Sequence, residues 1–569
     1  MSRFISLLQR HPGPRGRLGA DLEAALRETV PEPERNLASW RADESGRHLQ
    51  ATWDVPDRSL RRGLALCIGK LYSPDADWWQ PGSGSPDGSY VIVREDADAF
   101  EIVSDPAGSR MLWYYLDDEV FIASSSERAL TMACGRFDFD RATVPWLVST
   151  GTRGPGRSYN RHLRLVPPGG VARLDKAAWT LEVTAPEIAF AAVERSRDEH
   201  FAAIESALRA TFASFGPEDA RHMLIALSGG VDSRALAIFL GGDPAAGWRA
   251  YTGGWPTADD LPLSDASIAR RVAGALGIAH RRIVTEAPTG SVEAAIRRFI
   301  LGGEGRHDHL NGLSSGESFR SLREAPADTI VRGDECFGWK PVSSDTGVRQ
   351  SMDLLLCGDI ANFGSRLARF GLDGHRFPPE LDRRSGETLA AWRDRLYSSF
   401  RVPTVLAALN ESKSSYYDVV NPLLSRRVLE AARSLPDDLR TDKALFREVV
   451  DRLGPDVPFA TAREGVPGRF DTLNHPEIRR LLRASLASPT AERAFGKPLT
   501  AWLRAETGPA RVLADRVRRA ITRRLNRPAA PAGRYHVPPL RLAFRLHVAT
   551  TMIDQLTADA AHLARARAA

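Results

Sequence analysis

MLIALSGGVDS, residues 223–233, is the stretch that decides the fold of this chain. The apolar run 223–227 predicts a buried parallel strand, and residues 234–240 (RALAIFL) predict an amphipathic helix. Two adjacent glycines in the turn between them, Gly229 and Gly230, let backbone N–H groups approach an anion without interference from a Cβ atom. The amino terminus of the helix adds partial positive charge, so the turn is typical of a phosphate-binding loop. No Gly-Lys-Ser/Thr follows, which excludes a Walker loop.

Short apolar strands alternate with helices on both sides of this loop. The pattern predicts further strands at 248–252, 280–284 and 329–332, with a helix over 265–276. Such alternation is typical of a parallel α/β sheet, which binds its ligands at the carboxyl ends of its strands. Asp232 and Asp334 each follow a predicted strand, so we expect both at that edge.

The first part of the chain has a different pattern. Strand-like segments separated by Gly, Pro and Asp turns predict an antiparallel, sheet-rich α+β domain over 1–190, with strands at 89–93, 100–103, 112–116, 120–123 and 171–174. A second domain is predicted over 196–569, with a mostly helical region after about residue 350.

Composition limits the classes of function. The chain has 569 residues and a net charge of +6, so more than one domain is expected. We find no apolar run that could span a membrane and no signal peptide, and we expect a cytoplasmic protein with no membrane partner. The four cysteines lack metal-site spacing and are interpreted as reduced thiols. The basic stretch 511–527 is interpreted as a solvated helix face, with a grip on nucleic acid or an acidic peptide as the alternative.

Taken together, these segments resemble the asparagine synthetase family over nearly the whole chain. The first domain is similar to its glutaminase domain, of the N-terminal-nucleophile type. The second is similar to its ATP pyrophosphatase domain, also called a PP-loop domain, which splits ATP between the α and β phosphates. The segments that carry the resemblance are 105–125 and 163–169 in the first domain, and 228–233, 265–280, 333–338, 418–424 and 435–447 in the second.

The departures from the family pattern are informative. The glutaminase needs a cysteine at position 2, where this chain has Ser2, and its glutamine-holding Arg-Gly-Pro-Asp loop is missing. We therefore interpret the first domain as a scaffold and exclude ammonia as the nucleophile. The Gly333-Asp334-Glu335 loop is shortened and is followed by Phe337-Gly338-Trp339. These departures resemble the lasso peptide cyclases, which close a macrolactam in a ribosomal peptide. A β-lactam synthetase is the nearest alternative, and a tRNA-modifying ATP pyrophosphatase is a third.

The resemblance implies a reaction and its residues. An Asp or Glu side chain of a core peptide is adenylated, and the peptide's N-terminal amine then closes an isopeptide ring and releases AMP. The implied metal is Mg²⁺, with Asp232 and Asp334 as ligands. Lys443 matches the family's catalytic lysine. Asp418 matches an acidic residue that helps to deprotonate the amine, although a structural cap is an equal alternative. The implied ATP-binding residues are Leu227, Ser228, Gly229, Gly230, Asp232, Ser233, Thr252 and Gly333.

The implied partners are a ribosomal precursor peptide, a leader peptidase and a leader-binding protein, with no nucleic acid. Threading a peptide tail through a ring fixes many residues, at a cost of roughly 1–2 kcal/mol each, so the enzyme must enclose the peptide. We expect the helical region after 350 to supply aromatic side chains to that cavity, and the candidates are Trp392, Tyr397, Tyr416, Tyr417 and Trp502. Glu335 is expected to brace its loop.

Overall fold

The structure of the chain is a computed structural model. It describes residues 3–12, 15–30, 38–56, 58–73, 77–242, 244–255, 261–284, 291–309, 319, 322, 327–414, 416–462, 473, 475–508 and 535–562. Ser2 and the basic stretch 511–527 lie outside the described residues.

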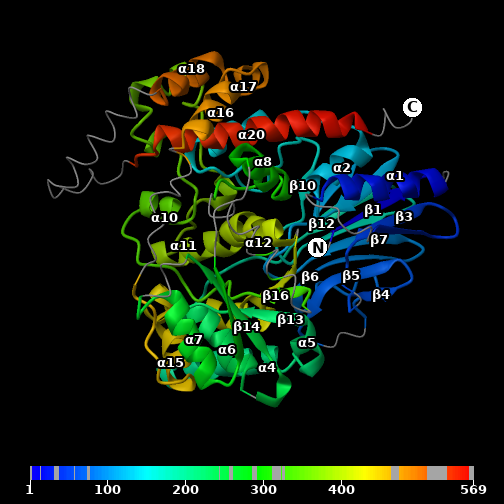
Figure 1. Cartoon of the computed structure of the whole chain (residues 1–569). Helices are drawn as coiled ribbons and strands as arrows, with labels where there is room; N and C mark the ends of the chain where they lie inside the picture. Colours follow the sequence, from blue (N-terminus) through cyan, green and yellow to red (C-terminus); the bar gives the residue numbers. More distant parts are fainter. Residues whose placement is uncertain are drawn as a thin grey trace.

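The N-terminal part is a sandwich of two antiparallel six-stranded sheets (Figure 1). The first has the order β10-β8-β9-β1-β3-β2 and comprises β1 Arg3–Gln9, β2 Ala38–Ala42, β3 His48–Trp53, β8 Trp113–Leu116, β9 Val120–Ser124 and β10 Arg164–Leu165. The second has the order β12-β11-β7-β6-β5-β4 and comprises β4 Leu60–Arg62, β5 Ala65–Leu71, β6 Gly88–Glu95, β7 Ala99–Ser104, β11 Val171–Asp175 and β12 Thr180–Thr184.

Side chains of β1 alternate between the two faces of its sheet, as strand geometry requires. Phe4 and Leu8 pack between the sheets. Ile5 and Leu7 pack on the other face, against α1 (Arg15–Glu28) and α2 (Glu127–Cys134). The N-terminal strand is therefore buried on both faces and lies inside its sheet, between β9 and β3.

A five-stranded parallel sheet forms the centre of the C-terminal part, in the order β15-β14-β13-β16-β17. Its first four strands confirm the predicted mixed fold: β13 Met223–Ala226, β14 Arg249–Gly254, β15 Ala279–Val284 and β16 Thr329–Val331. The fifth, β17 (Asp418–Val420), was not predicted and comes from the region after residue 350, which is otherwise mostly helical, as predicted, in the residues that the structure describes. Helices around this sheet in Figure 1 are α4 Arg197–Phe212, α6 Val231–Leu240, α7 Asp265–Ala275 and α15 Ala444–Leu453.

A long helical segment leads into β17. It consists of α11 (Leu389–Leu396), a π-helical stretch (Tyr397–Leu406) and α12 (Ala407–Ser414). Pro403 lies inside the π-helical stretch, where it has no backbone N–H to donate. Wide helical turns of this kind are frequent at functional sites, because they change the direction in which side chains project.

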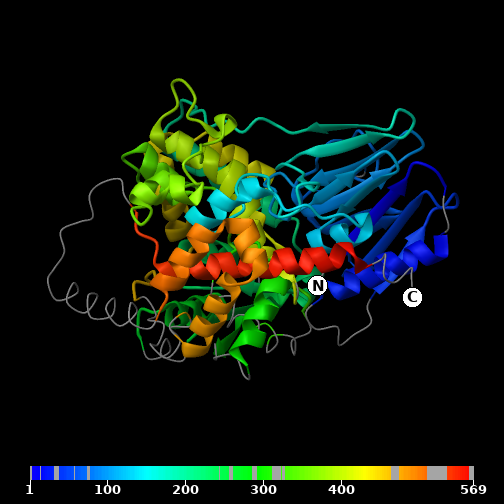
Figure 2. The same ribbon diagram turned by 90° about the horizontal axis from the view of Figure 1, so that it is seen from above.

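The C-terminal helix α20 (Pro539–Ala560) joins the two parts of the molecule. Figures 1 and 2 show it running past α16, α17 and α18 toward α1 and α2 of the N-terminal part. Near its end Asp559 accepts two hydrogen bonds from Arg128 of α2, at 2.8 and 3.1 Å. Within the described residues, no helix combines the length and apolar character needed to cross a lipid bilayer.

The remaining helices complete the outline. They are α3 Val144–Ser149, α5 Pro217–His222, α8 Val292–Gly302, α10 Asp345–Ser351, α13 Arg426–Arg433, α14 Asp437–Arg440, α16 Pro476–Leu486, α17 Pro489–Phe495 and α18 Lys497–Glu506. The predicted domain boundary falls in the segment 185–196, which connects β12 to α4.

Candidate functional site

The predicted phosphate loop lies between β13 and the amino terminus of α6. Gly230 is the N-cap of α6 and supplies no side chain to the cap, so the first N–H groups of the helix have no side-chain cap there. Ser233 holds the turn closed, because its Oγ accepts from the Ser228 N–H at 2.9 Å and lies 2.9 Å from the Ser228 Oγ. The geometry therefore matches an anion-binding strand-turn-helix.

Close packing against neighbouring segments requires a glycine at position 229. A Cβ atom at this position would lie 2.4 Å from the Cβ of Ala460, and the Ala460 N–H donates to the Gly229 carbonyl at 3.0 Å. Arg234 of α6 fixes the segment that carries Ala460, by donating to the carbonyls of Val457 and Pro458. The Gly229 N–H donates to Asp265 Oδ1 at 2.9 Å.

Lys443 connects the loop to a second acidic segment. Its Nζ lies 2.8 Å from both carboxylate oxygens of Asp232 and 3.1 Å from Oε1 of Glu335. Asp232 is in the first turn of α6, Glu335 follows β16, and Lys443 directly precedes α15. Three segments that are distant in sequence thus bring two carboxylates and one ammonium group together at the carboxyl edge of the sheet.

Burial changes the ionisation of this cluster. Burial raises the pKa of Glu335 to about 7, even though the charge of Lys443 lowers it. The pKa of Asp232 is also raised by burial, against the effect of Lys443, and the charge of Asp334 raises it further. Burial lowers the pKa of Lys443, but Glu335 and Asp232 outweigh this effect and raise it above its ordinary value. The ammonium group is therefore held charged, while burial favours the protonated form of the two carboxyl groups.

Asp334 is held by a separate set of partners. Its Oδ1 accepts from Arg332 at 3.0 Å and its Oδ2 accepts from Asn410 Nδ2 at 2.8 Å. Burial would raise the pKa of Asp334, but Arg332 outweighs it and the pKa is lowered. The side chain of Lys413, one helical turn after Asn410, is partly buried, and burial lowers the pKa of its amine well below the ordinary value.

The predicted magnesium ligands can be tested against this donor set. Among the described residues, no three His, Cys, Asp or Glu side chains are close enough to hold a metal ion by themselves. Mg²⁺ usually takes one or two protein carboxylates and completes its shell with water and phosphate oxygens. Asp232 and Asp334 come from neighbouring strand-ending segments and feel each other's charge, so they would hold an Mg²⁺ ion that arrives with a nucleotide.

Two other predicted ATP-binding residues have internal roles as well. The Thr252 hydroxyl donates to the Leu227 carbonyl at 2.7 Å and lies 2.8 Å from His280 Nε2, so it ties β14 to the loop. At Gly333 a Cβ atom would lie 3.0 Å from the Asp232 carbonyl carbon and 3.1 Å from the Ser233 nitrogen. The absence of a side chain at Gly333 therefore allows the segment after β16 to approach the loop closely.

The structure does not bring Asp418 to this cluster. Asp418 begins β17, where it pairs with Thr329 at the start of β16, and Asp334 follows the other end of β16. Its buried carboxylate forms an ion pair with Arg110 of the N-terminal part. Burial would raise the pKa of Asp418, but Arg110 outweighs it and the pKa is lowered. The geometry favours the structural alternative, and the role as a base stays a prediction.

Of the five aromatic residues expected at a peptide cavity, Tyr397 is the one placed beside the site. Its ring centroid lies 5.6 Å from that of Trp339, and burial together with the charges of Glu335 and Asp334 raises its pKa well above the ordinary value. Trp392 donates to the Leu381 carbonyl within the core. Trp502 packs on Phe363 and Phe370, and Tyr416 and Tyr417 pack near Phe319.

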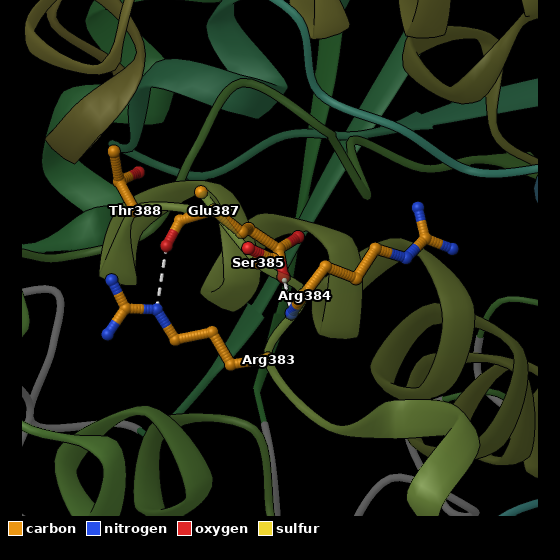
Figure 3. Close-up of a pocket in the computed structure, with 6 residues that line it drawn as sticks. Arg383, Arg384, Ser385, Glu387 and Thr388 are labelled. Atoms are coloured by element: carbon orange, nitrogen blue, oxygen red, sulfur yellow. Dashed lines mark hydrogen bonds between the residues drawn. The ribbon is translucent and has the colours of Figure 1, made fainter.

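A surface hollow elsewhere does not belong to the site. It is lined by Arg383, Arg384, Ser385, Gly386, Glu387 and Thr388. Figure 3 shows two arginine side chains extending away from each other, with Arg383 bonded to the Glu387 carbonyl at 2.7 Å. The hollow shares no lining residue with the phosphate loop, and its arginines already have partners within the turn or on the neighbouring segment 187–188.

Sequence reasoning missed the residues that hold the carboxylates in place. Arg332 and Asn410 carry no motif signal, and Asn410 is distant from Asp334 in sequence. Glu335 was expected to brace its loop, and it does accept from the Phe337 N–H. Its ion pair with Lys443 could have been inferred only by combining two separate motifs.

Comparisons with known proteins cover part of this site. The family model described as "Asparagine synthase" matches residues 218–300, which include the phosphate loop, β14, α7 and β15 but not Asp334 or Lys443. No curated protein sequence matched the chain. Residues 218–300, with the phosphate loop and the strands beside it, are thus similar to the asparagine synthase family, whose chemistry is ATP-dependent amide bond formation.

Proposed function

We propose that this protein is an ATP-dependent, AMP-forming amide ligase. More specifically, we propose that it acts as a lasso peptide cyclase on a ribosomal core peptide. The observation that carries the proposal is the position of Lys443, which lies charged and partly buried between Asp232 and Glu335 beside the phosphate loop. A cation at this place suits a reaction in which negative charge develops on the α-phosphate.

In the proposed reaction, a carboxylate oxygen of the peptide attacks the α-phosphorus of ATP, and the bond to the β-phosphate breaks. The free N–H groups at the start of α6 receive the leaving pyrophosphate. Bound Mg²⁺, held by Asp232 and Asp334, would reduce the repulsion between the two anions. The peptide's N-terminal amine then attacks the acyl carbon, AMP leaves with the bonding electrons, and the amine loses one proton.

For this reaction Lys443 must move relative to its present partners. In the structure its Nζ is shared between Asp232 and Glu335 and contacts both carboxylate oxygens of Asp232. Asp232 could not coordinate a metal ion while both of its oxygens contact Lys443. We expect the arrival of Mg-ATP to replace the contact with Asp232, while Glu335 keeps the ammonium group within reach of the phosphate. The second proposed partner group, a leader peptidase and a leader-binding protein, would deliver a peptide with a free N-terminus.

The test follows nucleotide and peptide in the same reaction. Purified protein, Mg-ATP and the leaderless precursor peptide are mixed. AMP is then quantified, and the mass of the peptide is measured by mass spectrometry. AMP formed together with a peptide that has lost one water supports the cyclase. ADP in place of AMP rejects the proposed chemistry.

The same experiment separates the alternatives. AMP formed with consumption of a small amino acid, and no change in any peptide, would favour a β-lactam synthetase-like ligase. AMP formed only with added tRNA would favour the third class. Glutamine hydrolysis that disappears in Ser2→Ala would overturn the interpretation of the N-terminal domain as a scaffold, and we expect no such activity.

A further inference from the structure

The two segments that carry Glu335 and Lys443 are joined a few residues further along the chain. The Asp442 N–H donates to the Trp339 carbonyl at 2.9 Å. Gly338 has a φ of +104°, and a Cβ atom there would lie 2.1 Å from the Arg440 carbonyl oxygen. The loop after Glu335 and the turn before Lys443 are therefore in direct backbone contact.

The turn itself is conformationally strained. Asp442 and Lys443 have φ values of +55° and +60°, so two consecutive residues other than glycine adopt the left-handed conformation. This conformation is unfavourable for residues with a Cβ atom, and such residues persist where the surroundings fix them. The strained turn aims Lys443 at Asp232 and Glu335.

A buried ion cluster lies behind the turn. Asp394 of α11 accepts two hydrogen bonds from its neighbour Arg393, at 2.7 and 2.8 Å, and one from Arg440 Nε at 2.6 Å. All three side chains are at most 3% exposed. One carboxylate is therefore shared by two arginines, and it ties α11 to the residue that ends α14.

The two arginines of this cluster contact both segments, the loop after Glu335 and the turn before Lys443. Arg393 donates to the Lys340 carbonyl at 2.7 Å, in the loop after Glu335. Arg440 donates to the Leu435 carbonyl at 2.5 Å and to Asp437, and it immediately precedes the turn. The ring of Phe190, from the segment between the two domains, lies 4.9 Å from the Arg440 guanidinium.

We propose that Asp394 is a positioning residue, which holds Lys443 at the nucleotide through Arg393 and Arg440. The inference rests on the proposed function, because it assumes that Lys443 acts on the phosphates. Asp394 contacts neither Lys443 nor the phosphate loop. Its effect passes through the left-handed turn, whose backbone would relax once either arginine loses its shared partner.

The test measures the placement of Lys443 and does not depend on the peptide substrate. An ATP analogue with an acyl group on its terminal phosphate acylates lysines beside the bound phosphates, and the labelled peptide is quantified by mass spectrometry with and without competing ATP. In the unaltered protein we expect labelling of Lys443 that ATP prevents. In Asp394→Asn, which keeps the shape and removes the charge, we expect labelling of Lys443 to fall about tenfold or more, with the affinity for ATP within about twofold.

A matched variant controls for the loss of a buried ion pair. Glu101 is also buried and shared by two arginines, Arg94 at 2.7 Å and Arg173 at 2.5 Å, but it lies in β7 of the N-terminal sandwich. Glu101→Gln should leave labelling of Lys443 unchanged. Asp394→Glu should recover part of the labelling lost in Asp394→Asn, because it restores the charge.

The outcomes distinguish the two proposals. If Lys443 of the unaltered protein is not labelled, the proposed site itself is wrong and the inference is rejected with it. If Lys443 is labelled equally in Asp394→Asn, the site stands and the positioning role is rejected. Should Asp394→Asn fail to fold, Arg440→Lys serves as the second variant, since lysine keeps the charge but cannot reproduce the planar fork of arginine; unchanged labelling there overturns the inference.

Discussion

Charged side chains are buried both at the carboxyl edge of the parallel sheet and at the boundary between the N-terminal and C-terminal parts, and these two regions arrange them differently. At the boundary, carboxylates are matched by arginines. Glu127 accepts from Arg153 and Arg306, and Asp418 pairs with Arg110. At the sheet edge, Lys443 is shared between Asp232 and Glu335.

The pKa values of the buried carboxyl groups also differ between the two regions. Burial would raise the pKa of Glu304 at the boundary, but Arg306 and Arg3 outweigh it and the pKa is lowered, as at Asp418. At the sheet edge burial dominates, and the pKa of Glu335 is raised to about 7. Asp334, held by Arg332, is the exception there. At the boundary, arginines hold the carboxylates ionised, as in ion pairs that serve folding, whereas at the sheet edge burial favours the protonated form of Glu335; shifted pKa values of this kind are typical of functional sites.

We expect the largest effect when one of the two proposed metal-binding carboxylates at the sheet edge is removed. Asp232→Ala or Asp334→Ala should abolish AMP formation while the protein stays folded, because the pair would hold the metal with the pyrophosphate. Turnover and thermal unfolding are measured on each purified variant. Asp345→Ala is the control, since Asp345 is likewise an acid in the first turn of a helix, α10. Full activity in either test variant would show that the pair is not a metal site.

The next effect concerns the cation of the same site. Lys443→Ala should still bind ATP and peptide but lose about 10²–10³ in rate, or about 3–4 kcal/mol, because a charge aimed at the developing negative charge is removed. Formation of AMP and of dehydrated peptide should fall together. The exposed Lys340 supplies the matched control, and Lys340→Ala should be as active as the unaltered protein. A variant that weakens ATP binding and leaves the rate at saturation unchanged would assign Lys443 to docking.

The sequence predicts those parts of the fold and the site whose residues are contiguous in the chain. The phosphate loop was predictable because apolar strand, glycine turn and helix are contiguous in 223–240. The strand β17 was not, because three residues between helical segments carry no periodic pattern, and its identity as a strand depends on pairing with β16. At Asp418 the motif position left two interpretations open, a residue that helps to deprotonate the amine and a structural cap. The sequence could not show the partner that favours the second interpretation, because Arg110 lies 308 residues away.

The third prediction tests whether the ion pair of Arg110 and Asp418, at the boundary between the two parts, stabilises the fold without taking part in the reaction. Arg110→Met leaves the Asp418 carboxylate buried without its arginine, so the free energy of unfolding should fall by about 3–5 kcal/mol. Asp418→Asn should also destabilise the protein, yet each folded molecule should keep its rate of AMP formation. Both variants are compared by chemical unfolding and by activity per folded molecule. An Asp418→Asn variant that is stable and inactive would move Asp418 into the catalytic site, as its motif position predicts.

The smallest expected effect concerns a buried polar chain inside the sandwich. His48 lies 2.6 Å from the Ser6 hydroxyl through Nε2 and bonds to Glu95 through Nδ1, and Lys176 lies 2.6 Å from the other oxygen of Glu95. Burial would raise the pKa of Glu95, but its bond to His48 and the charges of His48 and Lys176 lower it to about 2. The native state therefore binds fewer protons than the unfolded chain between about pH 4.5 and pH 2.

The sign of the resulting pH dependence follows from this difference. The stabilisation by Glu95 should be fully present above about pH 5 and should be lost as the pH falls through about 2, a change on the order of 2 kcal/mol. Thermal unfolding at pH 7, 5 and 3 measures it, and Glu95→Gln should show a smaller decrease between pH 5 and pH 3 than the unaltered protein. Equal decreases would mean that Glu95 gains nothing from its partners in the folded state. The boundary and the sandwich would then differ in how they stabilise buried charge, and only the arginine-matched carboxylates would retain the structural role assigned to them.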